Sequence, residues 1–412
     1  MKAEIITIGD ELLIGQVIDT NSAWMAQQLN LLGIDVKQIT SISDDRSHIL
    51  NTLVDASSRA DLIIITGGLG PTNDDITKKT LCEYFNTNLV FNELMYLNIQ
   101  SLFKSLGLQV TEINKAQAEI PENCEPILNS CGTAPGMWFE QNGKVYVSMP
   151  GVPFEMKQMM ENSILPKLKI KYHLEFVCHK TILTQGIGES FLSEIIAGWE
   201  KELPTFIKLA YLPSPGIVRL RLTAKGIDEM KIKNEIKRQT EVLKLLIPDY
   251  IYGYDHDKLE AIIGNLLKNN KQTLATAESC TGGYIAHLIT GIPGSSSYYK
   301  GSLVCYANEI KSKLLHIDEE RIIRNGAVSE EVVQQMALNI KNLFNVDYAI
   351  ATSGIAGPDG GTEVKPVGTT WIAIADKSGV FAKKFTFGDN RERNIQKASI
   401  TALNLLRKRI ID

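Results

Sequence analysis

The 412 residues of this chain are too many for one average domain and predict two or three domains. A hydrophobic content of 44%, a charged content of 22% and a net charge of −4 are typical of a globular protein and give no overall attraction to nucleic acid or anionic membranes. No apolar run is long enough to span a bilayer. From this and from the net charge, we expect neither a membrane nor a nucleic-acid partner.

The cysteines and the opening stretch indicate a cytoplasmic location. The start, MKAEIITIGDELL, lacks the pattern of a signal peptide. None of the six cysteines forms a CxxC pair, which disfavours a zinc ribbon or a dithiol redox centre. We therefore expect reduced thiols in the cytoplasm.

Residues 1–168 alternate strand and helix patterns. Buried strands are predicted at 3–8 and 61–66, with helices at about 22–32 and 45–58. Strands separated by helices predict an α/β domain with a parallel sheet and right-handed crossovers.

Residues 172–250 predict a small α+β middle module without a cluster of catalytic residue types. Its last helix, at 228–246, is rich in Lys and Glu. Because opposite charges alternate along it, a solvated helix face is favoured over a nucleic-acid surface. Residues 257–412 predict a second α/β domain with a strand at 272–277, long glycine-rich loops and a final amphipathic helix at 394–411.

A glycine-rich loop of the first domain, 66-TGGLGPTNDDITKKT-80, follows a buried strand. In a parallel sheet, ligands bind beyond the carboxyl ends of the strands, where this loop lies. Its glycines free the backbone to wrap a phosphate or pterin group, and the turn 149-MPGVPFEM-156 offers another backbone nest. The expected ligand-loop residues are Gly67, Gly68, Gly70, Pro71 and Gly151.

Carboxylates near the same edge suit a hard divalent metal ion. Asp74 and Asp75 are adjacent near a helix start, and the first loop adds Asp10 and Asp19. Alternatively, these acids only cap helices and complement their dipoles. The sequence does not assign individual ligands among the four.

The stretch 277-AESCTGGYIAHLIT-290 predicts a strand that delivers Ser279 and Cys280 to a turn before a helix. Free backbone amides at a helix start can bind a phosphate or stabilise an oxyanion. Alternatively, this is an ordinary strand–helix turn with Thr281 as the N-cap. The expected substrate-binding residues of this turn are Glu278, Thr281, Gly282 and Gly283, and the amides of the last three could form an oxyanion site.

A second stretch, 300-KGSLVCYANEIKSKLL-315, predicts a strand that ends at Tyr306, an N-cap at Asn308 and Lys311 in the first helical turn. A cation at a helix N-terminus has a lowered pKa, so Lys311 in a water-free site can act as a general base. Alternatively, Lys311 is a solvated surface lysine.

Two further loops favour a ligand site. The dense Gly/Pro loop 353-SGIAGPDGGTEVKPVGTTWIAI-374 lies between two predicted strands and places Lys365 where it could meet a phosphate. The segment 388-GDNRER-393 supplies Arg391 and Arg393 as anion partners. The further expected substrate-binding residues are Asn308, Ser353, Gly354, Gly357 and Arg391.

These motifs resemble the CinA C-terminal family, which includes the PncC-type nicotinamide-nucleotide amidases. The resemblance covers 257–412 through AESCTGG, Tyr306-Ala-Asn-Glu-x-Lys311, 326-GAVS-329 and SGIAGPDGG…KPVGT. It implies hydrolysis of nicotinamide mononucleotide to nicotinate mononucleotide and ammonia by a serine–lysine pair, without a cofactor. Ser279 is then the nucleophile, Lys311 the base and Tyr306 a proton relay. Cys280 is the rival nucleophile, but no histidine is close to it in the sequence.

Residues 1–168 resemble the molybdopterin-binding fold of the MoaB/MogA group, and Pro71 with Asp74-Asp75 fits the CinA N-terminal version more closely. Some members of that family use this domain as a metal-dependent ADP-ribose pyrophosphatase. The middle module is KH-like in the family, although 183-LTQGIGE-189 matches GxxG only in part.

The leading hypothesis is therefore a two-headed homodimeric enzyme of pyridine-nucleotide salvage, with nicotinamide mononucleotide and ADP-ribose as substrates and a divalent metal ion in the N-terminal domain. The alternatives are a non-enzymatic competence- or damage-induced binding protein, a molybdopterin-binding protein, and an enzyme in which only the C-terminal head is active.

Overall fold

A computed structural model describes residues 1–72 and 75–411. Contacts divide the chain into two compact units, residues 1–178 with 224–233 and residues 179–223 with 234–412. No helix in the described part of the chain is long and apolar enough to cross a membrane.

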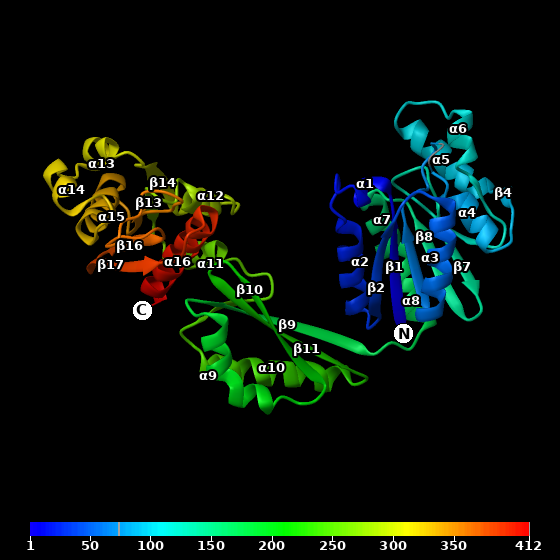
Figure 1. Ribbon diagram of the computed structural model, residues 1–412, viewed down its shortest axis with the longest axis horizontal. Helices are drawn as coiled ribbons and strands as arrows, with labels where there is room; N and C mark the ends of the chain where they lie inside the picture. The colour runs from blue at the N-terminus through cyan, green and yellow to red at the C-terminus, as the bar shows by residue number, and fades with distance from the viewer. Residues whose placement is uncertain (73–74, 412) are drawn as a thin grey trace. The chain divides into compact units, whose positions relative to one another are not determined.

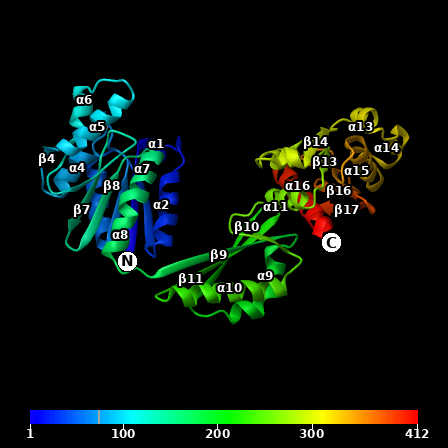
Figure 2. The ribbon, with the colours of Figure 1, turned by 180° about the vertical axis from the view of Figure 1, so that it is seen from behind.

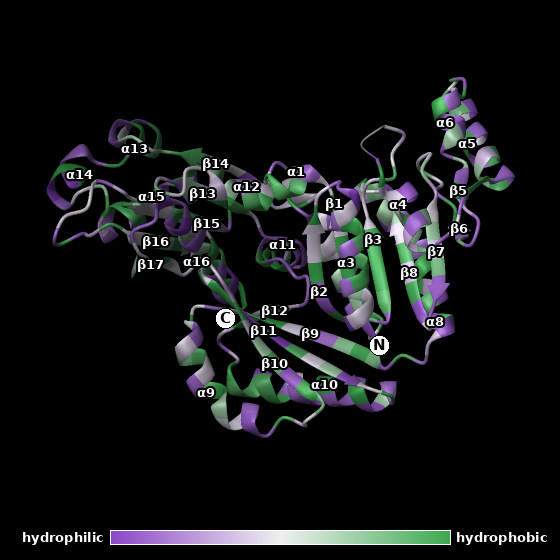
Figure 3. Ribbon diagram, turned by 45° about the vertical axis from the view of Figure 1, so that its right-hand side comes forward, coloured by the Kyte–Doolittle hydropathy of each residue, from purple (hydrophilic) through white to green (hydrophobic). Residues whose placement is uncertain are grey.

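The first unit contains a six-stranded sheet in the order β2-β1-β3-β8-β7-β6. The first four strands are parallel, as predicted, but β7 and β6 are antiparallel to their neighbours. Figure 3 shows β3, the LIIIT strand, as mainly hydrophobic. Such a run is typical of a strand that is covered on both faces. The strands are β1 (Lys2–Ile8), β2 (Asp35–Ile42), β3 (Leu62–Thr66), β6 (Glu125–Ile127), β7 (Gly136–Gln141) and β8 (Lys144–Met149).

Helices pack on both faces of this sheet because successive strand residues point to opposite sides. In β1, Ala3 and Ile5 enter one core, and Ile6 and Ile8 enter the other. Figure 1 shows α3 in front of the sheet, and Figure 2, from behind, shows α7 and α8 in front of it. The covering helices are α2 (Thr20–Leu31), α7 (Pro153–Met159), the π-helical turn Met160–Ile164 and α8 (Leu165–Lys171) on one face, and α3 (Arg46–Arg59) and α4 (Thr77–Tyr84) on the other.

An additional substructure follows α4 and has no counterpart among the predicted elements. Strands β4 and β5 pair antiparallel, and Met95 and Ile99 pack with Ala118 in a small separate core. Its elements are β4 (Leu89–Phe91), α5 (Glu93–Ser105), α6 (Glu112–Ala116) and β5 (Glu119–Pro121).

The middle module is a four-stranded sheet in the order β10-β11-β9-β12, with two helices. Trp199 is buried and donates a 2.7 Å hydrogen bond to Gln239. Arg238 pairs with Glu235 on an exposed helix face, as the alternating charges predict. The elements are β9 (Phe176–Gln185), α9 (Glu189–Lys201), β10 (Ile207–Ser214), β11 (Ile217–Gly226), α10 (Glu229–Leu246) and β12 (Ile251–Tyr254).

The C-terminal domain has a five-stranded sheet in the order β14-β13-β15-β16-β17, parallel across β14, β13 and β15 and antiparallel beyond. Helices again form separate cores on its two faces. The strands are β13 (Leu274–Glu278), β14 (Tyr299–Val304), β15 (Tyr348–Gly354), β16 (Thr369–Asp376) and β17 (Gly379–Thr386). The helices are α11 (Leu259–Asn269), α12 (Tyr284–Thr290) and α16 (Arg391–Ile411) on one face, and α13 (Asn308–Leu315), α14 (Glu319–Asn325) and α15 (Glu330–Phe344) on the other.

The α/β fold class is confirmed, but three predicted details are wrong. Strand β14 ends at Val304 rather than at Tyr306. The N-cap of α13 is Ala307, and Asn308 is the first helical residue without a side-chain capping bond. Helix α16 begins at Arg391, so Arg391 and Arg393 lie in the helix and not in a loop before it.

Candidate functional site

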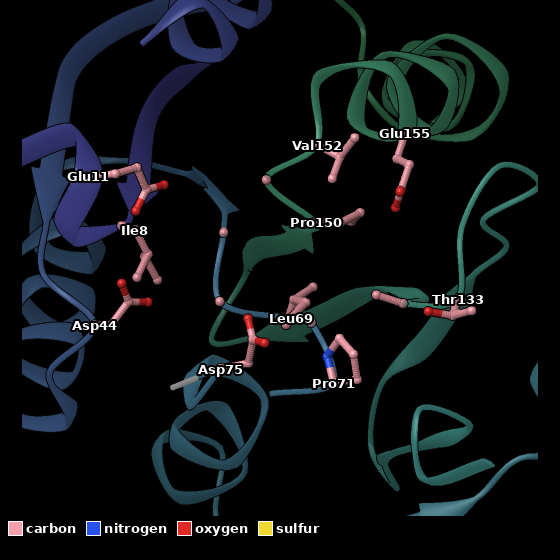
Figure 4. A pocket seen from close by; sticks show the side chains of 16 residues that line it. Ile8, Glu11, Asp44, Leu69, Pro71, Asp75, Thr133, Pro150, Val152 and Glu155 are labelled. Atoms are coloured by element: carbon pink, nitrogen blue, oxygen red, sulfur yellow. The ribbon is translucent and has the colours of Figure 1, made fainter. Parts of the chain in front are cut away.

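A cavity of about 490 Å³ lies in the first unit at the carboxyl ends of β1, β3 and β8, where the parallel-strand rule places a ligand. All five expected ligand-loop residues line it (Figure 4). The lining residues are Ile8, Gly9, Glu11, Asp44, Gly67, Gly68, Leu69, Gly70, Pro71, Asp75, Thr133, Ala134, Pro150, Gly151, Val152 and Glu155.

At two positions of the loop after β3, the backbone conformation and the close packing leave room only for glycine. Gly67 and Gly68 have φ values of +113° and +64°, which favour glycine. A Cβ atom on Gly67 would collide with the carbonyl oxygen of Ile8, and one on Gly68 with the Thr77 hydroxyl. The chain therefore places bare backbone against the cavity, as a ligand-wrapping loop requires.

Several carboxylates line this cavity, but of the four predicted metal ligands only Asp75 is among the described residues that line it. Glu11 and Asp44 lie on one side and Glu155 on the other, with Asp75 on the loop after β3 (Figure 4). Burial raises the pKa of Asp44, and the charges of Asp10, Glu11 and Asp75 raise it further. Sequence reasoning missed Asp44, although it follows β2 at the same edge of the sheet.

None of the other three predicted metal ligands is among the described residues that line this cavity. Asp10 does not line the cavity; its backbone amide donates to the Asp44 carboxylate at 3.1 Å. Asp19 caps α2 by accepting from the Ser22 amide at 2.9 Å and lines a neighbouring cavity of about 110 Å³. Asp74 lies outside the described residues.

Carboxylate oxygens line the cavity, but they form no complete cage for a metal ion. Within 1–72 and 75–411, no group of three or more His, Cys, Asp or Glu is placed to hold a metal ion. Mg²⁺ typically takes only one or two carboxylates and completes its shell with water and substrate phosphates. Glu11, Asp44 and Asp75 would supply such ligands. A cation would counter the neighbouring negative charges, which add to the effect of burial in raising the pKa of Asp44.

The second site begins where β13 ends. Glu278 is fully buried, and its carboxylate accepts hydrogen bonds from the Thr281 hydroxyl at 2.8 Å and from the amides of Gly283, Ile285 and Ala286 at 3.0, 3.1 and 2.9 Å. Glu278 thus neutralises the start of α12 from inside the protein. In the structure this expected substrate-binding residue therefore has its carboxylate engaged within the protein.

The same contacts correct the expected oxyanion site. The Gly283 amide is bonded to Glu278, and the Gly282 amide donates to the Ser279 carbonyl at 3.1 Å. Of the three expected donors, only the Thr281 amide has no acceptor among the described residues. Thr281 itself is not the N-cap, because α12 begins at Tyr284 after Gly283.

Ser279 lies at the turn after Glu278, 8% exposed, and its amide donates to the Thr352 carbonyl at 3.0 Å. Its neighbour Cys280 is buried, and burial raises the pKa of that thiol to about 12. Cys280 is therefore a protonated thiol at neutral pH, which disfavours it as a nucleophile.

Lys311 is 1% exposed, so it is not the solvated lysine of the alternative interpretation. Its ammonium Nζ donates to the Tyr306 carbonyl at 3.1 Å. Burial lowers the pKa of Lys311, and the neighbouring thiols of Cys305 and Cys280 only partly oppose that shift. Lys311 is thus a buried amine of lowered pKa whose electrostatic neighbours include Cys280, the residue next to Ser279.

Arg391, at the start of α16, connects two loops of this site. Its guanidinium donates to the Tyr306 hydroxyl and to the Gly357 carbonyl, both at 2.8 Å. Tyr306 is 58% exposed, so its hydroxyl remains open to solvent and to a ligand.

The other predicted residues mainly shape the loops. The Ser353 hydroxyl donates to the Ala327 carbonyl at 2.7 Å, and Lys365 donates to the Asn325 carbonyl at 2.8 Å. A Cβ atom on Gly354 would lie 3.0 Å from the sulfur of Cys280. Asn308 is exposed.

The folds and the two sites define a fusion of a molybdopterin-binding-like α/β domain, a small α+β module and a second α/β domain. Family models match in that order: "Probable molybdopterin binding domain" over 4–170, "Damage-inducible protein CinA KH domain" over 179–253 and "CinA C-terminal domain" over 256–410. The chain belongs to the CinA family.

Similar proteins cover the whole chain. The CinA-like protein of Flavobacterium psychrophilum is 51% identical over 100% of this chain and 99% of its own length, and that of Cytophaga hutchinsonii is 50% identical over 99% and 98%. The crystal structure of competence damage-inducible protein A from Klebsiella pneumoniae is 34% identical over 37% of this chain and 95% of its own, with a TM-score of 0.36.

Proposed function

We propose that the C-terminal domain is an amidohydrolase that converts nicotinamide mononucleotide to nicotinate mononucleotide and ammonia. The observation that carries this proposal is Lys311, a buried amine with a lowered pKa that interacts electrostatically with Cys280, the residue that follows Ser279 in the turn. Amide hydrolysis needs an activated nucleophile, a base and a proton donor for the leaving amine, and a serine–lysine pair supplies all three.

In this mechanism the Ser279 hydroxyl attacks the carboxamide carbon while the neutral amine of Lys311 takes its proton. The resulting ammonium then returns the proton to the leaving nitrogen, and ammonia departs from the tetrahedral intermediate. Water hydrolyses the acyl-serine with Lys311 again acting as base. The Thr281 amide is available for the oxyanion, and the Arg391 guanidinium, beside Tyr306, for the phosphate.

The assay is ammonia release from nicotinamide mononucleotide by the purified full-length chain. Activity without added metal is expected, since the mechanism uses only side chains. A folded protein that binds the nucleotide but releases no ammonia would favour a non-enzymatic binding function.

We further propose that the N-terminal domain cleaves the pyrophosphate of ADP-ribose with a divalent metal ion held by residues among Glu11, Asp44 and Asp75. The ion would polarise the attacking water and the phosphate oxygens. The carboxylate-lined cavity and the bare backbone of Gly67 and Gly68 support this proposal. The test is AMP formation from ADP-ribose with Mg²⁺ and its loss with EDTA. Binding of molybdopterin precursors without cleavage would favour a cofactor-binding function instead.

A further inference from the structure

A third cavity, of about 610 Å³, lies within the second compact unit, between the middle module and the C-terminal domain. It shares no lining residue with either site described above. Its walls are the turn between β9 and α9 (185–189), the β10–β11 turn, the end of β17 with the segment after it, and one side of α16. Its volume lies within the usual range for sites that bind small molecules.

Positive charge dominates its lining. Lys383, Lys397 and Lys408 line the cavity, and Glu189 is the only acidic residue beside them. Over the described chain, no ion pair involves any of these three lysines. Lys397 donates a long 3.4 Å hydrogen bond to the Phe387 carbonyl. The lysines therefore give the cavity a positive charge that the protein does not neutralise.

One wall is a rigid polar network. Gln185, Thr401 and Asn404 are each less than one-tenth exposed and line the cavity. Gln185 donates to the Thr401 hydroxyl at 3.2 Å and accepts from the Asn404 amide, whose oxygen accepts from Arg407 at 2.9 Å. Because the network satisfies its own polar groups, these side chains are fixed before any ligand arrives.

Apolar and backbone groups complete the lining. Phe385 and Phe387 are stacked with ring centroids 5.6 Å apart, and Tyr250 also lines the cavity. Gly188, the N-cap of the 13-residue helix α9, gives it no side-chain capping bond. The positive end of that helix faces the same turn, although Glu189, its first residue, opposes part of the field of the lysines.

We propose that this cavity binds a small phosphorylated molecule of mononucleotide size. Its phosphate lies among the lysine ammonium groups and the turn at Gly186–Gly188, and the rest of the molecule contacts the aromatic side chains. This proposal is independent of both proposed activities, because it uses none of their residues.

AMP is the probe, and hydrogen–deuterium exchange of the full-length protein is the measurement, because it locates the binding. We expect AMP to slow exchange in peptides that cover 186–192 and 383–387. The double variant Lys383→Gln/Lys408→Gln should lose that protection and weaken AMP binding at this site at least about tenfold, since two of the three charges are removed. Lys237→Gln/Lys244→Gln, which removes two exposed charges from α10, is the matched control and should bind normally.

A second variant separates binding from folding. Gly188→Asp supplies a preferred N-cap at a backbone conformation that suits it, φ −80° and ψ 157°, but places a negative charge at the cavity. It should keep or raise the melting temperature and abolish AMP protection, whereas Gly188→Ala should keep the protection. Protection confined to the other two sites, protection that survives both charge variants, or protection by a single-stranded oligonucleotide but not by AMP would overturn the proposal.

Discussion

The choice between two adjacent nucleophiles rests on burial and charge. Ser279 and Cys280 occupy the same turn, but the thiol has a pKa of about 12 and remains protonated at neutral pH. A serine does not have to ionise in advance, because a nearby base removes its proton during the attack. Lys311 is suited to that task because burial disfavours its charged form.

Lys311→Met should reduce ammonia release by about 10²- to 10⁴-fold, the usual contribution of a general base. For the unmodified enzyme, kcat/KM should fall as the pH decreases through the lowered pKa of Lys311, because protonation removes the base. The variant should lose this dependence yet melt no earlier, since it no longer buries a desolvated amine. A variant with the original pH profile would contradict the assignment.

At the scale of elements, Glu278 joins the end of β13 to the start of α12. Its carboxylate accepts from three backbone amides and from the hydroxyls of Thr276, Thr281 and Ser302, and these bonds tie the turn that carries Ser279 to the start of α12. Glu278 can do this because successive side chains of a strand point to opposite faces of the sheet. A residue one position along the strand would face the other side of the sheet.

Glu278→Gln should lower the free energy of unfolding by about 2–3 kcal/mol, because an amide has one acceptor oxygen and its NH₂ group faces backbone donors. Urea denaturation of the full-length protein measures this change. Glu309→Gln, at an exposed pair with Lys313, is the control and should change the stability by less than about 0.5 kcal/mol. Equal stability of the two variants would contradict the role given to Glu278.

Much of this architecture follows from sequence pattern. The apolar run of β3 and the glycines after it predict both a buried strand and the cavity loop, and the structure has both. The hydrogen-bond partners of Glu278 and the participation of Asp44 could not be predicted, because each depends on how distant elements pack together. Strands β4 and β5 were missed because each is only three residues long.

At the scale of the whole molecule, the two proposed active sites lie in different compact units and share no residues. Asp44→Asn should therefore reduce metal-dependent ADP-ribose cleavage at least about tenfold and leave ammonia release unchanged. Asp55→Asn, an exposed acid on α3, should alter neither activity. Parallel loss of both activities in Asp44→Asn would show that the two heads do not work independently.

The central claim is that Ser279 is the nucleophile of an amidohydrolase, and the most direct test is ammonia release from nicotinamide mononucleotide by Ser279→Ala and Cys280→Ala. The account predicts that Ser279→Ala abolishes release while the protein stays folded, and that Cys280→Ala retains most of it. Release that survives in Ser279→Ala but disappears in Cys280→Ala would contradict the mechanism.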